Sequence, residues 1–143
     1  MKTLKSIVLG LALLVICGVA KANTTNTIDE KTTPNYAINT FVDAMTRGKL
    51  AGLDGVLDKT AEFNMLRGKT MLSFGKNDML AFFKENQNIE QSCTTSTSIV
   101  ESTPNVTIVK VSMKYDDFVR NNYVTIANTG NGWKITNVYS VFK

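Results

Sequence analysis

The chain has 143 residues, which is the usual size of one domain. It is 43% hydrophobic and 20% charged, an ordinary composition that excludes the disordered, collagen-like and disulfide-stapled classes of protein. It carries 16 Lys and Arg against 12 Asp and Glu but no His, which excludes every catalytic or metal site that requires an imidazole.

The N-terminal segment is typical of a secretory signal peptide. Two lysines precede an almost unbroken apolar run of 14 residues from Ile7 to Ala20, which is shorter than the roughly 20 residues that span a bilayer. Ala20-Lys21-Ala22 then matches the small-x-small pattern of a cleavage site. Residues 1–22 are therefore predicted to be a signal peptide that is cut after Ala22, so that the protein is exported to the periplasm or secreted. A core helix is the weaker alternative, because the run has no polar face.

Cleavage would change the charge and the cysteine content of the chain. It would remove three lysines and no acid, leaving 13 basic and 12 acidic residues and a net charge of +1. Such a chain lacks a clustered basic excess, so we expect no nucleic-acid partner and, after cleavage, no membrane partner. Cys17 makes lipoprotein processing an alternative, although Ile16 stands where such sites carry a small residue. After cleavage Cys93 would be the lone cysteine, and we expect its side chain to pack rather than react. We expect the protein to bind no metal and no cofactor.

The first half of the mature chain is predicted to be mainly helical. Residues 23–33 are polar and rich in Thr and Asn, and are predicted to form a flexible leader. A helix follows, because Thr33 can cap it, Pro34 suits its first turn and Gly48 can end it. The next predicted elements are a short helix over Leu50–Leu57, strands over Ala61–Leu66 and Thr70–Phe74, and a helix over Asp78–Asn86.

Long strands rich in Val, Ile, Thr and Tyr occupy the rest of the chain, with turn residues between them. They are predicted over Thr94–Thr103, Asn105–Tyr115, Phe118–Asn128 and Trp133–Phe142. Helices first and a meander of strands last indicate an α+β domain over residues 34–143, in which the N-terminal helices cover one face of a curved antiparallel sheet.

The turns predict the register of the last three strands. A two-residue loop at Asp116-Asp117 and the Gly-rich loop after Asn128 each define a hairpin. The expected pairs are Val111 with Asn122, Asn128 with Trp133, Val124 with Asn137 and Asn122 with Tyr139. Directly opposed residues share a sheet face, and one face collects most of the apolar side chains. This interior face is predicted to hold Val109, Val111, Met113, Tyr115, Phe118, Arg120, Asn122, Val124, Ile126, Trp133, Ile135, Asn137, Tyr139 and Val141.

The predicted interior includes polar side chains at one end of the sheet. They could satisfy one another, or they could orient a small molecule between aromatic walls, and both interpretations stay open. The predicted ligand-binding residues are Phe41, Met45, Phe63, Met65, Tyr115, Arg120, Asn122, Asn137 and Tyr139. Apolar residues on the outer face could be ordinary scatter or the seam of a homodimer. They are Val119, Tyr123, Val138 and Phe142.

Several segments resemble proteins of the nuclear transport factor 2-like superfamily. The closing strand from Gly132 to Phe142 carries the resemblance, and so do the opening helix and the strand–turn–helix segment. The further matching residues are Ala37, Phe41, Ala44, Gly48, Phe63, Gly68, Gly75 and Phe82. Within the superfamily the chain is most similar to a bacterial family labelled putative lumazine-binding, through Tyr115–Phe118 and Asn122–Ala127. The resemblance covers Asn35 to Lys143 and implies a cone-shaped fold with a cavity between sheet and helices. The family name implies a pterin-like ligand.

Three classes of function fit this resemblance. The superfamily includes steroid isomerases, polyketide cyclases and dehydratases, and the isomerases and cyclases need an Asp or His base in the cavity. The chain has no His, and the predicted register places no carboxylate on the interior face of the sheet, so no catalytic residue is predicted. The sequence therefore favours an exported, non-enzymatic protein that binds a flat aromatic or pterin-like small molecule. An enzyme of the isomerase, cyclase or dehydratase type and a dimeric interaction domain are the alternatives.

Overall fold

A computed structural model describes residues 29–143 of the chain. The predicted signal peptide, the cleavage site after Ala22, Cys17 and residues 23–28 of the leader lie outside the described residues. Among the helices of the described part, none is both long and apolar enough to cross a membrane.

The described residues form four helical segments and six strands, and α4 lies between β2 and β3 in the chain. The helices are η1 (Glu30–Thr32), a 3-10 turn, and α2 (Pro34–Arg47), α3 (Leu53–Val56) and α4 (Lys76–Glu85). The strands are β1 (Leu57–Arg67), β2 (Thr70–Gly75), β3 (Thr94–Ser102), β4 (Val106–Lys114), β5 (Val119–Asn128) and β6 (Trp133–Phe142). The predicted elements are all present. The largest difference is that the second helix is shorter than expected and β1 correspondingly longer.

Helix α2 begins and ends at the residues that the sequence indicated. The Thr33 hydroxyl accepts a hydrogen bond from the backbone N–H of Tyr36, and Pro34 occupies the first turn. Gly48 ends the helix in the left-handed conformation, with φ of 63°, and its N–H donates to the carbonyl of Ala44.

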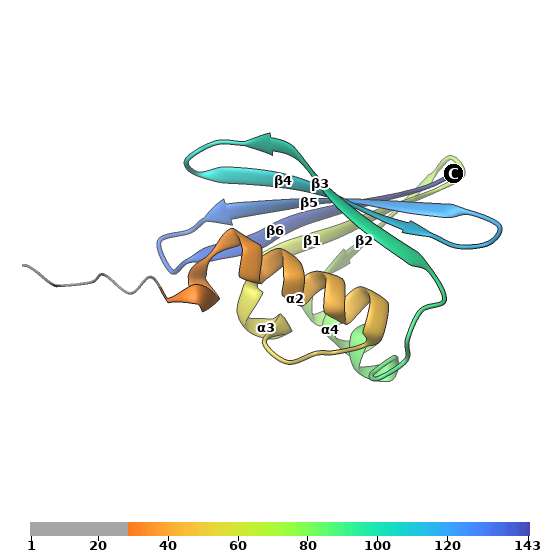
Figure 1. Cartoon of the computed structure of the whole chain (residues 1–143), viewed down its shortest axis with the longest axis horizontal. Coiled ribbons are helices and arrows are strands. Elements are labelled where there is room, and N and C mark those ends of the chain that lie inside the picture. Colours follow the sequence, from red (N-terminus) through yellow and green to blue (C-terminus); the bar gives the residue numbers. More distant parts are fainter. Residues whose placement is uncertain (1–28) are drawn as a thin grey trace, which may run out of the picture.

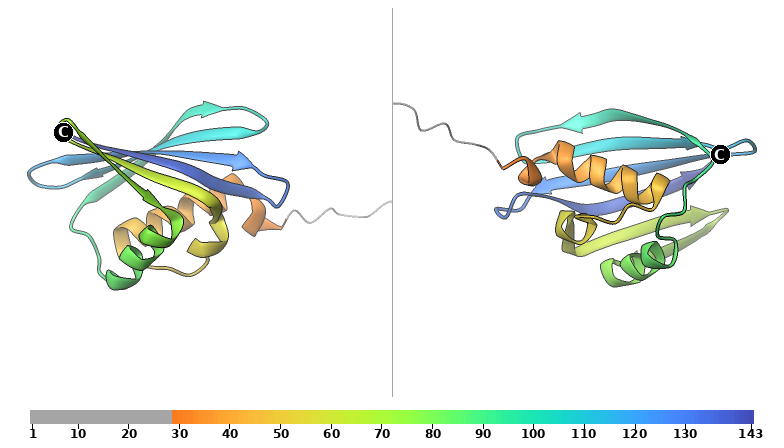
Figure 2. Two further views of the ribbon diagram at one scale, coloured as in Figure 1. Left: turned by 180° about the vertical axis from the view of Figure 1, so that it is seen from behind. Right: turned by 60° about the horizontal axis from the view of Figure 1, so that its bottom comes forward.

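The six strands form one open, curved sheet in the order β2-β1-β6-β5-β4-β3 (Figure 1). Neighbouring strands are antiparallel except for β1 and β6, which are parallel. The helices lie on one face, with α2 running along the sheet and α4 beside β1 and β2 (Figure 2). The α+β class and the curved sheet covered by helices are therefore confirmed.

The predicted register holds for the first hairpin and for half of the second. Val111 lies opposite Asn122, and Asn128 lies opposite Trp133. A β-bulge then places one extra residue, Thr136, in β6. Beyond the bulge the pairs are Val124 with Val138, Asn122 with Ser140 and Arg120 with Phe142. The predicted pairs of Val124 with Asn137 and of Asn122 with Tyr139 are wrong.

The bulge exchanges the two faces of the last part of β6, because one extra residue moves every following side chain to the other side of the sheet. Asn137, Tyr139 and Val141 point to the outer face, not to the interior as predicted. Val138 and Phe142 are on the helix-covered face, not on the outer face. Two residues of the predicted dimer seam are thus wrongly placed, whereas Val119 and Tyr123 keep their outer positions.

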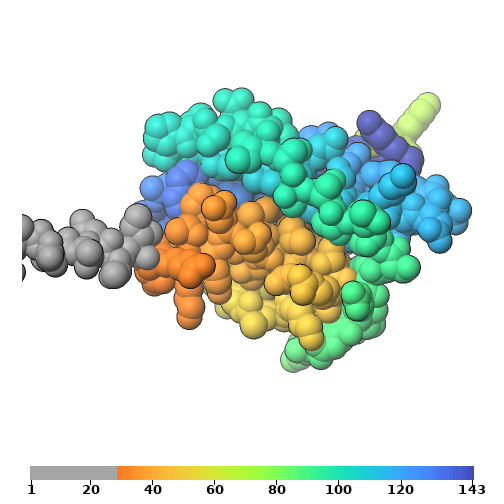
Figure 3. Space-filling view, viewed as in Figure 1, coloured from red at the N-terminus to blue at the C-terminus, as the bar shows by residue number. Residues whose placement is uncertain are grey.

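The core fills the space between α2 and the middle of the sheet. Its largest fully buried side chains include Phe41, Leu53, Met113, Ile126 and Ile135. Figure 3 shows α2 covering the middle of the molecule, while the β1–β2 turn and the end of β6 project beyond it. The helices therefore close one end of the sheet and leave the other end accessible.

Candidate functional site

A pocket of about 650 Å³ opens between α4 and the projecting end of the sheet. We call it the α4 pocket. Its lining residues come from β1, β2, α4, the segment after α4, and the ends of β4, β5 and β6. They are Met65, Arg67, Leu72, Phe74, Asp78, Met79, Ala81, Phe82, Gln91, Tyr115, Phe118, Arg120 and Phe142.

Phenylalanines dominate the walls of the α4 pocket. Phe74, Phe82, Phe118 and Phe142 all line it, and each is between 37% and 51% exposed. The rings of Tyr115 and Phe118 are stacked, with centroids 4.5 Å apart and planes at 13°. Large apolar side chains that gather at one concave place instead of scattering are typical of a binding surface.

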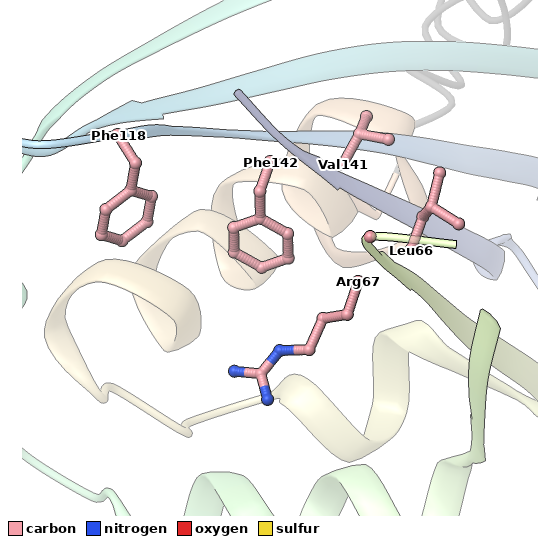
Figure 4. Close-up of a pocket in the computed structure, with 6 residues that line it drawn as sticks. Leu66, Arg67, Phe118, Val141 and Phe142 are labelled. Carbon is pink, nitrogen blue, oxygen red and sulfur yellow. The ribbon is translucent and has the colours of Figure 1, made fainter. Parts of the chain in front are cut away.

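A second hollow of about 450 Å³ adjoins the pocket and shares Arg67, Phe118 and Phe142 with it. Figure 4 shows Phe118 and Phe142 projecting toward the helices, and Arg67 reaching into the same space. Leu66 and Val141 point the other way, as expected for the opposite sheet face. Phe118 and Phe142 therefore line both the α4 pocket and this second hollow.

Arg120 lies in the α4 pocket and is held by polar side chains from two strands. Its Nε donates to Oδ1 of Asn122 over 2.9 Å, and its Nη2 donates to Oγ of Ser140 over 3.3 Å. The Ser140 hydroxyl donates to the same Asn122 oxygen over 2.6 Å. Asn122 itself is fully buried, and its Nδ2 donates to the carbonyl of Val111 over 3.4 Å. This network fixes the direction of the guanidinium.

The charge of Arg120 has no protein counter-ion in the described residues. The two ion pairs found there join Arg47 to Asp43 and Lys76 to Asp54. Burial lowers the pKa of Arg120; the neighbouring Tyr115 raises it, and the positive charge of Arg67 lowers it. The guanidinium cation is therefore held in a poorly solvated place, beside the ring of Phe142, whose centroid lies 5.5 Å from Cζ.

Tyr115 lines both the α4 pocket and a small inner cavity of about 70 Å³. Its hydroxyl donates to Oε1 of Gln91 over 3.1 Å, and Gln91 is tied to α2 through a bond from its N–H to the Thr46 carbonyl. Burial raises the pKa of Tyr115, and the neighbouring Cys93 raises it further, so the phenol is neutral at physiological pH. Phe82, Gln91, Tyr115 and Arg120 line both spaces.

The lining offers little for acid–base or metal chemistry. Asp78 is the one carboxylate among the described lining residues, and its Oδ2 accepts a hydrogen bond from the N–H of Gly75 at the start of α4. Asp78 is exposed to solvent. Over residues 29–143, no three His, Cys, Asp or Glu side chains gather in a way that could hold a metal ion.

The predicted ligand-binding residues fall into three groups in the structure. Met65, Tyr115 and Arg120 line the α4 pocket, Met45 lines the inner cavity, and Asn122 lies directly behind Arg120. Phe41 and Phe63 are buried in the core and line neither space. Asn137 and Tyr139 are on the outer face because of the bulge.

The sequence reasoning missed most of the aromatic wall. Phe82 was identified as a residue that carries the family resemblance but not as a ligand-binding residue, and Phe142 was predicted on the outer face of the sheet. The positions of Phe74 and Arg67 depend on the pairing of β1 with β2, in which Phe74 lies opposite Phe63. The spacing of three between Ile135 and Val138, where alternation requires two, is the signal that could have revealed the bulge.

Comparison with known proteins identifies similar sequences and folds. The family model described as "Putative lumazine-binding" matches residues 29–140. A solved NTF2-like protein of unknown function from Silicibacter pomeroyi is similar with a TM-score of 0.63 and 16% identity, over 76% of this chain and 92% of that one. An NTF2-like protein from Cytophaga hutchinsonii is similar with a TM-score of 0.60 and 11% identity, over 80% of this chain and 98% of that one. An NTF2-like protein of unknown function from Methylobacillus flagellatus is similar with a TM-score of 0.57 and 14% identity, over 85% of this chain and 96% of that one. No curated protein matches in sequence. These likenesses concern the fold alone, and they confirm the predicted nuclear transport factor 2-like architecture.

Proposed function

The chain belongs to the "Putative lumazine-binding" family, and from this premise we propose that it binds a flat aromatic small molecule in the α4 pocket without catalysing a reaction. The ligand class includes pterin-like compounds, which the family description suggests. The family and the fold support a ligand-binding domain in general, and the lining residues support the more specific proposal.

The observation that carries the proposal is the exposure of four phenylalanines around one pocket. Each of these residues leaves more than a third of its surface in water. Covering such surface stabilises a complex by roughly 25 cal/mol per Å² removed from water. A planar ring would find stacking partners in the walls, and Arg120 and Gln91 would meet its polar atoms. The scarcity of carboxylates in the lining supports binding over catalysis.

Direct titration tests the proposal. We expect lumazine or pterin to bind the purified protein with measurable heat and with quenching of the ligand's own fluorescence. The variant Phe118→Ala should bind about 2–13-fold more weakly, because an aromatic contact contributes roughly 0.5–1.5 kcal/mol. Ile99→Ala is the matched control, since Ile99 is 69% exposed and does not line the pocket.

Two outcomes would contradict the proposal. One is the absence of binding by either ligand at millimolar concentration. The other is equal weakening by Phe118→Ala and Ile99→Ala, which would place the binding surface elsewhere. Turnover of a pteridine, detected as a new product, would favour the enzymatic alternative.

Export and dimerisation are separate proposals. We propose that the protein is periplasmic or secreted after cleavage following Ala22, and mass spectrometry of the N-terminus of the protein isolated from its host tests this. A chain that begins with a lipid-modified Cys17 would contradict it. The homodimer through the outer sheet face stays a prediction that rests on Val119 and Tyr123, and light scattering over a range of concentrations tests it.

A further inference from the structure

The guanidinium of Arg120 is only partly satisfied by the protein. Of its five N–H groups, the one on Nε and one on Nη2 have acceptors among the described residues. Both acceptors lie on the same edge of the planar guanidinium. The edge formed by Nη1 and the second N–H of Nη2 has no hydrogen-bond partner in the described part of the chain.

This open edge is accessible. Every fully buried side-chain nitrogen or oxygen of the described residues has a hydrogen-bond partner. Nη1 has none and therefore is not fully buried, and Arg120 lines both the α4 pocket and the inner cavity. Its two parallel N–H groups match the two oxygens of a carboxylate in a bidentate arrangement.

The charges around the pocket favour an anion. Arg67 from β1 and Arg120 from β5 face the space, and Asp78 from α4 is exposed at its edge. Tyr115, at the end of β4, is a neutral phenol, and its partner Gln91 is a neutral amide. The acceptors that hold Arg120, an amide and a hydroxyl, carry no negative charge. A poorly solvated cation without a counter-ion is costly for a protein, and an anionic ligand group would compensate it.

The available room favours a small group at this point. The inner cavity of about 70 Å³ compares with the roughly 30 Å³ that a water molecule occupies in the liquid, so it accommodates a carboxylate-sized group. The larger α4 pocket shares Arg120 with this cavity, and its lining includes Phe82, Phe118 and Phe142. A ring carrying one carboxylate fits this succession of spaces.

We propose that the ligand of the α4 pocket is an aromatic carboxylate, whose two oxygens accept from Nη1 and Nη2 of Arg120 while its ring lies among the phenylalanines. This inference rests on the proposed function, because it names the ligand class of the same pocket. It differs from it in requiring an ionised acid, which lumazine and pterin do not carry.

A matched pair of ligands tests the inference on the unmodified protein. Pterin-6-carboxylate and pterin have the same ring, and at a pH slightly below neutrality pterin is uncharged. Titration calorimetry should show the carboxylate binding about 10–100-fold more tightly, because hydrogen bonds to charged groups contribute roughly 1.5–3 kcal/mol. Equal affinities would overturn the inference and leave the proposed function intact. If neither compound binds, the proposed function itself fails.

Substitutions test which arginine binds the carboxylate of the ligand. Arg120→Gln should reduce the ratio of the two affinities to about one, while Arg47→Gln, a surface arginine outside the pocket, should leave it unchanged. Asn122→Asp is a second, nearly isosteric variant that supplies a counter-ion at Nε, and it too should reduce the ratio. If only Arg67→Gln abolishes the preference, Arg67 is the anion receptor and the assignment to Arg120 is wrong.

Discussion

Asn122 shows how one buried amide organises the candidate site. Its oxygen accepts from both Arg120 and Ser140, and its nitrogen reaches the carbonyl of Val111 and the sulfur of Met113. No part of the side chain contacts solvent. The residue therefore satisfies donors that would otherwise be buried without acceptors, and it orients the guanidinium that faces the pocket.

Removing this amide is expected to destabilise the fold. Asn122→Ala should lower the free energy of unfolding by about 1–3 kcal/mol, because buried donors lose their acceptor. The matched control is Asn137→Ala, also an asparagine in the sheet but half-buried on the outer face, which should change stability by less than about 0.5 kcal/mol. Urea denaturation measures both. A larger loss in Asn137→Ala would contradict the bulged register.

Gly48 illustrates a second constraint at the residue scale. It adopts a φ of 63°, and an added Cβ would lie 2.6 Å from the backbone nitrogen of Asn88 and 2.7 Å from the carbonyl oxygen of Asn86. Gly68 has a similar φ of 59° at the tip of the β1–β2 turn, but nothing lies within 4 Å of its Cβ position. Alanine at Gly68 would therefore cost only the strain of the left-handed backbone, whereas alanine at Gly48 would add a steric clash of its Cβ with the segment after α4.

We expect Gly68→Ala to destabilise the protein by roughly 1–2 kcal/mol, the cost of the left-handed conformation for an L-residue. Gly48→Ala should cost clearly more, because the segment after α4 must also move away from the end of α2. Thermal unfolding of the two variants provides the comparison. Equal shifts in Tm would mean that the two segments can separate without loss of stability.

At the scale of elements, the bulge in β6 decides which residues form the site. An unbroken strand would place Tyr139 inside and Phe142 outside. The extra residue at Thr136 reverses both positions, so Ser140 reaches Arg120 and Phe142 reaches the pocket. The register of the parallel partner β1 is also irregular between Leu57 and Glu62, beside the bulge. Bulges increase local twist and bending, which suits the curvature of this sheet.

A pair of valines tests the position of the bulge. Val138→Ala should lower the free energy of unfolding by about 2 kcal/mol, because a buried side chain is truncated in the core. Val119→Ala, on the outer face of β5, should cost less than about 1 kcal/mol. Urea denaturation measures the two losses of stability, provided that both variants keep the same m-value. Equal losses would be inconsistent with Val138 facing the helices.

At the scale of the whole molecule, the α4 pocket exists only when distant parts of the chain are folded together. Its walls come from β1 and β2, from α4, and from the ends of β4, β5 and β6. Their residues run from Met65 to Phe142, so no short segment carries the site. Ligand binding is therefore coupled to the folding of the whole domain.

This coupling predicts stabilisation by ligand. Pterin-6-carboxylate at 100 times its dissociation constant should raise the free energy of unfolding by about 2.7 kcal/mol. Urea unfolding should show a higher midpoint and an unchanged slope. An unchanged midpoint at concentrations where calorimetry shows occupancy would mean that the compound also binds the unfolded chain.

The order and type of the elements follow from the sequence alone. Thr33, Pro34 and Gly48 define α2 by local hydrogen bonding and backbone geometry, and the strand boundaries follow from turn residues and β-branched runs. The register of the β4–β5 hairpin is equally local, because a two-residue turn leaves little choice of partners. Tyr115, Arg120 and Asn122 were identified in this way as residues of the interior face.

The tertiary structure decided the composition of the pocket wall and the charge environment of Arg120. The parallel pairing of β1 with β6 joins segments more than 70 residues apart, which local preferences do not encode. The bulge at Thr136 lies within the β5–β6 hairpin, but the turn after Asn128 does not determine it. Phe41 and Phe63 looked like cavity residues because apolar periodicity reports burial but does not distinguish a filled core from an open pocket. That distinction depends on where the helices end relative to the sheet, and here they leave Arg120 with one open edge.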